Sequence, residues 1–162
     1  MMRRIAIMAA MAMMISLGFV QKAEAREADQ IQAVIEASKA IVSAFGRDDP
    51  DAYFKLFAPD ATFIFHTTQR RLEDRRAYEL EWATWRRNLG FRVRSCTSSN
   101  QRVQLFGEAA ILSHDVRTEI TTNEGDAPLM ERETIVFHRR GGRWIAVHEH
   151  LSPQPPATSA MR

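Results

Sequence analysis

Apolar residues recur at helical spacing in two stretches of the chain. In residues 27–46 they are Ile, Val and Phe, and in residues 74–89 they are mainly Tyr, Trp and Leu. Each stretch carries its apolar residues on one side, which indicates an amphipathic helix. Gly46 and Gly90 follow the last periodic residues and are expected to end the two helices.

A short helix and a short strand are predicted between these two helices. Asp49-Pro50 is typical of a helix start, with aspartate as the N-cap and proline in the first turn. Pro59 is expected to end this helix. Residues 61–66 are rich in β-branched and aromatic side chains, which indicates a strand.

From residue 91 onward the apolar period falls to two, as in half-buried strands. Glycine-containing turns separate the segments at hairpin spacing, and a break is expected near residues 98–100. The predicted strands are 91–106, 109–122, 129–140 and 143–151. Helices followed by antiparallel strands predict an α+β fold. A curved antiparallel sheet would wrap around three helices of the N-terminal half and leave a cavity inside.

The first 25 residues have the composition of a secretory signal peptide. Arg3-Arg4 precedes an apolar run at residues 5–20, and Ala23-Glu24-Ala25 is a small-x-small cleavage site. The apolar run is shorter than the roughly 20 residues of a membrane-spanning helix. We therefore expect cleavage after Ala25, a periplasmic or secreted protein, and no membrane association after cleavage.

Removal of residues 1–25 changes the charge of the protein. It leaves 19 basic and 19 acidic residues, so the net charge falls from +2 to zero, which gives no support to nucleic-acid binding. Cys96 is the only cysteine, so it is either a structural thiol or the link of a disulfide-bonded dimer. The remaining length fits one domain. We place this domain at residues 26–152 and expect a disordered Pro/Ala/Ser/Thr tail at residues 153–162.

Two motifs resemble a known superfamily. The first spans residues 48–63 and includes the run Phe57-Ala58-Pro59-Asp60-Ala61-Thr62, and the second spans residues 133–152 and includes Trp144-Ile145-Ala146-Val147-His148-Glu149-His150. With the order of elements, they are similar to SnoaL-like proteins, which have the cone-shaped fold of nuclear transport factor 2 and ketosteroid isomerase. The second motif also resembles the association (hub) domain of calcium/calmodulin-dependent kinase II. The resemblance implies the cone fold and a homodimer through the outer sheet face.

The resemblance does not carry over the catalytic residues of ketosteroid isomerase. The general base of that family falls at Phe65 and its hydrogen-bonding tyrosine near Ile41, and neither side chain can exchange a proton or donate a hydrogen bond. A shift of one residue would place His66 at the base position, which leaves another acid–base reaction open. The pocket arginine of the hub domain falls at Ile135, so that pocket is not reproduced.

Three histidines are the candidate catalytic residues. His66 ends the first predicted strand, where the resemblance places the pocket mouth. His148 and His150 are two residues apart on the last strand and are expected on one face with Trp144 and Ala146. They could be structural, act as acid and base near pH 7, or bind a metal with a third ligand. Two histidines at this spacing are a weak metal signal, so we predict neither a metal nor another cofactor.

The candidate pocket residues come from the helices and from the sheet. The aromatic stripe of residues 74–89 either packs in the core or forms a wall for a flat apolar ligand. His114 and Asp115 lie on opposite faces of one strand, and alternation does not tell which face is inside. Glu131 and Glu133 share a face, so one of them is expected to line the cavity. The candidates are Tyr53, Tyr78, Trp82, Trp85, His114 and Glu133.

Three functional hypotheses follow from the sequence. In the first, the exported protein is a homodimer that binds a small, largely apolar molecule in the cone pocket. In the second, it is a cofactor-free lyase, isomerase or hydrolase that uses pocket histidines as acid and base. In the third, it is a hub-like homo-oligomeric assembly module. An open cavity containing polar residues would favour the first two, and a filled cone with an apolar outer face would favour the third.

Overall fold

The computed structural model describes residues 2–154, and the chain divides into two compact units between Ala33 and Val34. The first unit belongs to the helix α1 (Met2–Gly46), and the second unit contains the end of α1 and all other elements. Within the described residues, no helix has a stretch long and apolar enough to cross a membrane. Pro153 is the last residue of the sheet, and the rest of the predicted tail, from residue 155, lies outside the described residues.

Helix α1 ends at Gly46 as predicted, and its last four turns bury Val34, Ile41 and Ala44. Gly46 allows the end of the helix to approach the backbone of Cys96 closely. A Cβ atom at Gly46 would lie 2.9 Å from the backbone nitrogen of Cys96, a distance that a real side chain would not tolerate. The glycine therefore sets the distance between α1 and the sheet.

The two following helices begin at the predicted caps. The Asp49 carboxylate accepts a hydrogen bond from the first turn of α2 (Pro50–Phe54), and Asp74 does the same for α3 (Arg75–Leu89). Gly90 ends α3 in the left-handed conformation. Helix α2 ends at Phe54, earlier than predicted. Pro59 does not end the helix and instead belongs to the first strand, an edge strand that tolerates proline.

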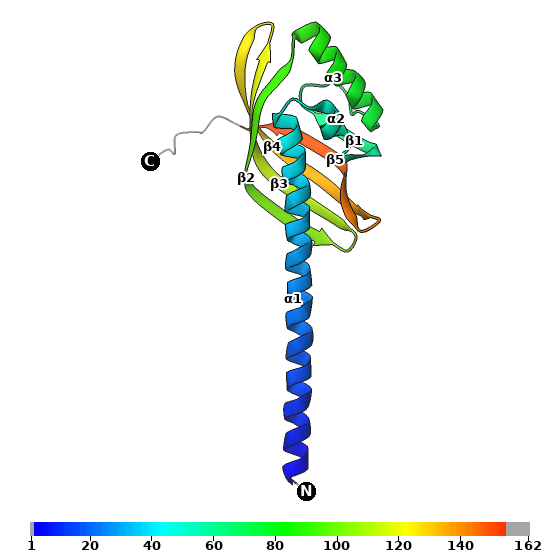
Figure 1. The fold of residues 1–162 in the computed structure, drawn as a ribbon, viewed down its shortest axis with the longest axis vertical. Helices are drawn as coiled ribbons and strands as arrows, with labels where there is room; N and C mark the ends of the chain where they lie inside the picture. The colour runs from blue at the N-terminus through cyan, green and yellow to red at the C-terminus, as the bar shows by residue number, and fades with distance from the viewer. Residues whose placement is uncertain (1, 155–162) are drawn as a thin grey trace, which may run out of the picture. The chain divides into compact units, whose positions relative to one another are not determined.

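The five strands form one mixed sheet in the order β1-β5-β4-β3-β2. Strand β1 runs parallel to β5, and the other neighbours are antiparallel. Figure 1 shows the sheet curving beside the helices, which confirms the α+β fold, although the sheet is mixed rather than wholly antiparallel. The strands are β1 (Phe57–Phe65), β2 (Arg92–Phe106), β3 (Ala109–Thr122), β4 (Gly125–Arg140) and β5 (Arg143–Pro153).

Two irregularities in the strand pairing determine which side chains point inward. In β2 the register shifts between Ser99 and Arg102, at the predicted break. In β5 the pairing shifts between Ala146 and His148, which leaves Val147 as an extra residue. Because of this bulge, Ala146 and Glu149 are both buried on the inner face.

The prediction that His148 and His150 share a face with Ala146 is therefore wrong, although the two histidines do lie on the same face as each other. His148 and His150 pair with Thr62 and Ile64 of β1, whose side chains are less buried than those of the neighbouring β1 residues. They share the outer face with these residues and do not share a face with Ala146. An extra residue inverts the alternation of all later side chains in a strand, and regular spacing could not predict that.

The core fills the space between the inner face of the sheet and the helices. Tyr53 from α2 contacts Tyr78 and Trp82 from α3, with ring centroids 6.0 and 5.6 Å apart. Tyr78 in turn lies 4.8 Å from the ring of Phe63 in β1. All four rings are buried. Aromatic packing thus holds the Tyr53 ring in place, and its hydroxyl reaches Glu149 of β5.

Candidate functional site

Two adjoining hollows lie between the helices and the inner face of the sheet. The larger, here called the chamber, has a volume of about 260 Å³. The smaller, here called the carboxyl cavity, measures about 30 Å³, enough for about one water molecule. Residues that line both hollows are Phe45, Thr118, Glu131 and Leu151.

The walls of the chamber are almost entirely apolar. Trp85 and Tyr78 from α3 face Phe65 at the end of β1, and apolar residues of β3 and β4 complete the wall. Such a hollow, apolar with few polar groups, is the usual form of a small-molecule site. The remaining lining residues are Thr67, Leu89, Phe91, Ile120, Thr122 and Leu129.

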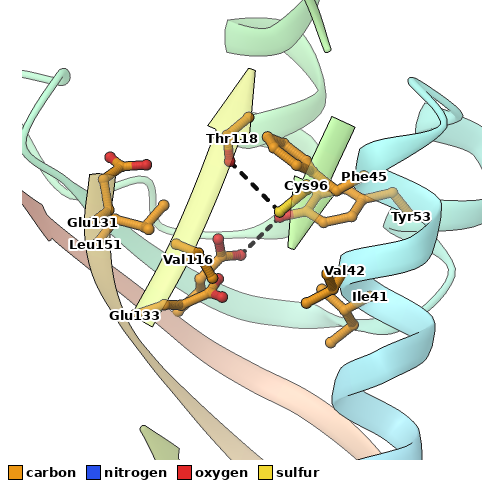
Figure 2. Close-up of a pocket in the computed structure, with 11 residues that line it drawn as sticks. Ile41, Val42, Phe45, Tyr53, Cys96, Val116, Thr118, Glu131, Glu133 and Leu151 are labelled. Carbon is orange, nitrogen blue, oxygen red and sulfur yellow. Dashed lines mark hydrogen bonds between the residues drawn. The ribbon is translucent and has the colours of Figure 1, made fainter. Parts of the chain in front are cut away.

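The carboxyl cavity is more polar and is formed by six elements. Figure 2 shows Ile41, Val42 and Phe45 of α1 on one side and Glu131 and Glu133 of β4 on the other. Helix α2, β2, β3 and β5 contribute the other residues of the wall, Tyr53, Cys96, Val116, Thr118, Glu149 and Leu151. Three carboxyl side chains therefore border a space the size of one water molecule.

Glu133 and Glu149 form a buried, hydrogen-bonded carboxyl pair. Burial raises the pKa of Glu133 to about 7, because charging a carboxyl group away from water is costly. Burial, and then the charge of Glu133, hold the pKa of Glu149 well above its usual range. The Tyr53 hydroxyl donates a hydrogen bond of 2.9 Å to Oε2 of Glu149. Both carboxyl groups of the pair therefore hold a proton more readily than an exposed glutamate does.

His114 lies on the inner face of β3 and contacts Glu133. Its Nε2 lies 2.5 Å from Oε2 of Glu133, and its Nδ1 lies 2.6 Å from the Ser98 hydroxyl. His114 is buried and Asp115 is more exposed, which answers the question that strand alternation left open. Burial lowers the pKa of the His114 imidazole to about 4, so the ring is neutral at physiological pH.

His66 lies directly after β1, next to the chamber. Its Nε2 is 2.6 Å from Oε1 of Glu131, and its side chain is about one-third exposed. Glu131 lines both hollows. His66 is therefore the one candidate catalytic histidine that contacts a residue of the site. His148 instead lies 2.8 Å from the Thr62 hydroxyl on the outer face, and His150 shares that face.

The predicted pocket residues occupy different parts of the site. Tyr78 and Trp85 line the chamber, and Tyr53 and Glu133 line the carboxyl cavity. Trp82 is buried in the aromatic core and lines neither hollow. The two positions that match the ketosteroid isomerase residues also belong to the site, but as apolar wall: Phe65 in the chamber and Ile41 in the cavity.

Sequence reasoning missed Glu149 and Ser98. Glu149 lies between the two candidate histidines of β5, and regular alternation from Ala146 assigns it to the outer face. Ser98 lies in the predicted break of β2, but nothing in its local sequence indicates contact with His114. Within the described residues, no group of three or more His, Cys, Asp or Glu side chains could hold a metal ion.

Comparison with known proteins identifies the fold independently. The structure is similar to a protein described as a scytalone dehydratase from Novosphingobium aromaticivorans (TM-score 0.68, 15% identity, 80% of this chain and 87% of that chain covered). It is also similar to an NTF2-like protein from Cytophaga hutchinsonii (TM-score 0.66, 13% identity, 77% and 98% covered). At such low identities these similarities concern the fold alone.

A third similar structure is described as a calcium/calmodulin-dependent kinase II association domain from Xanthomonas campestris (TM-score 0.62, 18% identity, 79% of this chain and 88% of that chain covered). Proteins of different description therefore share this fold. The sequence itself matches the family model of the SnoaL-like domain over residues 34–157. This match includes the whole sheet, both hollows and most of the chain, and the protein therefore belongs to the SnoaL-like domain family.

Proposed function

We propose that this domain binds a small, mainly apolar molecule without negative charge in the chamber. The observation that carries the proposal is the chamber itself, a space of about 260 Å³ with apolar walls that adjoins a group of carboxyl side chains. The cone is thus not filled by its own side chains, which argues against a role in assembly alone. The ligand would bury its apolar part against Trp85, Tyr78 and Phe65.

The charge of the lining residues supports the restriction on the ligand. No lysine or arginine is among the described residues that line either hollow, so an anion would lose its hydration without gaining a counter-charge there. Glu131 lies at the border of the two hollows and receives one hydrogen bond from His66. A carboxylate accepts several hydrogen bonds, so Glu131 can also accept one from a hydroxyl or amine of the ligand.

A second candidate function is proton transfer to or from the bound molecule without a cofactor. The observation that favours it is the group of three carboxyl side chains that line one small cavity beside the chamber, where burial raises the pKa of Glu133 to about 7. A group that titrates near the working pH is suited to general acid–base catalysis, and perturbed titration in a hollow is common at functional sites. Binding is the first step of both functions, so it is tested first.

Binding can be tested with three probes that share a skeleton and differ in their polar end: 2-phenylethanol, 2-phenylethylamine and phenylacetate. The melting temperature of the full-length protein is measured with each probe, and calorimetry gives the affinities. A molecule that binds only the folded state raises the melting temperature. We expect the alcohol or the amine to bind, and phenylacetate to bind at least tenfold more weakly.

A pair of tryptophan substitutions distinguishes the chamber from the surface. Leu129→Trp places a large ring in the chamber and is expected to abolish binding. Leu80→Trp adds the same ring to an exposed position of α3 and serves as the control. Equal binding by the two variants, or tighter binding of phenylacetate than of the other probes, would refute the proposal.

A further inference from the structure

A series of polar contacts leads from the sheet surface to the carboxyl cavity. Nε2 of the exposed Gln101 donates a hydrogen bond of 2.9 Å to the Ser98 hydroxyl at the β2 bulge. Ser98 contacts Nδ1 of His114, and Nε2 of His114 contacts Glu133. Both ring nitrogens of the buried imidazole are therefore engaged, each by a different strand.

The series continues on the other side of Glu133. Glu133 is hydrogen-bonded to Glu149, and Glu149 accepts a hydrogen bond from Tyr53. Other side chains around Glu133 are the carboxyl of Glu131 and the thiol of Cys96, while α1 contributes only apolar groups. No lysine, arginine or histidine is among these described lining residues, and His114, which lines neither hollow, contacts Glu133 from beside the cavity. Hydrogen bonds must therefore stabilise any charge there.

Counting hydrogens restricts the protonation states of this series. A neutral imidazole has one N–H, and an ionised carboxylate only accepts. If Glu133 carries the charge, Nε2 of His114 must bear the hydrogen and Nδ1 must accept from Ser98. The proton of Glu149 then points to Glu133. Every contact in the series has one hydrogen in this arrangement, and the buried group carries a single negative charge.

We propose that Glu133 and Glu149 form an acid–base pair that shares one proton, and that Ser98 and His114 are its positioning residues, with the imidazole held as the Nε2–H tautomer facing Glu133. The pair adjoins the chamber through Glu131 and Leu151, which border the cavity on the chamber side. This inference rests on the second function proposed above and assigns its proton-transferring group.

The positions of His114 and Ser98 affect the ionisation of Glu133. A charge-assisted hydrogen bond from a fixed N–H stabilises the ionised form of Glu133, which would otherwise stay protonated because of burial. The carboxylate of Glu133 disfavours the other tautomer, in which Nε2 would be an acceptor facing an acceptor, and the Ser98 hydroxyl supports the Nε2–H form by donating to Nδ1. The carboxyl of Glu133 is thereby kept in a state that can both take up and release a proton near neutral pH.

The tautomer can be observed directly, without a ligand. Nitrogen-15 NMR of the full-length protein, labelled at histidine, reports which ring nitrogen of His114 carries the hydrogen at pH 7.5. Carbon-13 labelling at glutamate follows the titration of Glu133, with Glu133→Gln for assignment. We expect a neutral His114 ring with hydrogen on Nε2, and a Glu133 midpoint near neutral pH.

Two substitutions test the positioning residues, and one serves as the control. Ser98→Ala should produce a mixture of His114 tautomers and raise the Glu133 midpoint. His114→Leu should raise the midpoint by about one to two pH units, as expected for the loss of a hydrogen bond to a charged group. His114→Gln retains an N–H donor and should keep the Glu133 midpoint close to that of the wild-type protein. Ser99→Ala, at an exposed neighbouring position, should change neither signal.

Each outcome decides the inference. A His114 ring with hydrogen on Nδ1 alone, an imidazolium at pH 7.5, or a Glu133 midpoint unchanged in both Ser98→Ala and His114→Leu would overturn it. If His114→Leu does not fold, Ser98→Ala and His114→Gln give the decision. If the probes do not bind but His114 has the expected tautomer, only the chamber proposal is rejected. If the probes bind but His114 has the opposite tautomer, only the positioning inference is rejected.

Discussion

The Tyr53 hydroxyl donates a 2.9 Å hydrogen bond to Glu149, across 96 positions of sequence, from α2 to β5. Both side chains are about 2% exposed. Tyr53 is surrounded by aromatic rings, which hold its side chain in place. This contact fixes the carboxyl pair to the aromatic core.

Tyr53→Phe keeps the ring and removes the donor to Glu149. We expect a loss of about 1–3 kcal/mol in the free energy of unfolding, the usual effect of leaving a buried polar group without its partner. Urea denaturation of Tyr53→Phe, Glu149→Gln and the double variant measures the coupling. Strictly additive effects would show that the two side chains do not interact in solution.

Stability is predicted to fall as pH rises. The pKa of Glu133 is about 7 in the folded protein and 4.5 ordinarily, and that of Glu149 is raised well above its usual value. For Glu133 the folded state holds a proton that the unfolded state has lost between pH 4.5 and about 7, so stability decreases across this range by about 1.4 kcal/mol per pH unit. Glu149 contributes in the same direction. His114, lowered from 6.5 to about 4, acts in the opposite direction between these two values.

Replacing His114 should therefore make the pH dependence steeper. His114→Gln removes the opposing contribution, so the unfolding free energy should fall more steeply between pH 4.5 and 6.5, by the equivalent of about one proton. Denaturation curves at several pH values give the slope. His138→Gln, an exposed histidine of β4, should keep the original slope. A slope unchanged in His114→Gln would mean that His114 is not held neutral in the folded protein.

Cys96 is predicted to react slowly with alkylating reagents. Burial raises the pKa of its thiol from 9.0 to about 11, and the thiolate is the reactive form, so its population at pH 8 falls about 100-fold. Alkylation of the folded protein should be slower by at least this factor than alkylation in urea. Ser95→Cys with Cys96→Ser moves the thiol to an exposed neighbour and should react at the ordinary rate. Fast alkylation of Cys96 in the native protein would indicate that the cavity opens readily.

We propose that residues 1–25 direct export and are then removed. Mass spectrometry of the exported protein should find Arg26 at the N-terminus. Ala25→Leu should block cleavage because the cleavage site needs a small residue there. Glu24→Gln leaves the small-x-small pattern intact and should be cleaved normally. Retention of residues 1–25 in the exported wild-type protein would contradict the proposal.

Much of the fold follows from local signals in the sequence. The caps Asp49 and Asp74 and the stop at Gly90 act within a few residues of their own positions, so the sequence around them was sufficient. The β4–β5 hairpin was likewise readable from alternation and its glycine pair. The parallel pairing of β1 with β5 was not, because the two strands are far apart in the sequence and no local feature specifies their relative direction.

The sequence by itself determined the α+β class, the element order and several of the side chains that line the two hollows, Tyr53, Tyr78, Trp85 and Glu133 among them. Only the tertiary structure decided how they combine. The Val147 bulge turns Glu149 inward and leaves His148 outside, and the packing of α2 against the sheet brings Tyr53 to Glu149. Periodicity is a local property that one extra residue inverts, whereas the pairing of buried polar groups depends on contacts between distant strands.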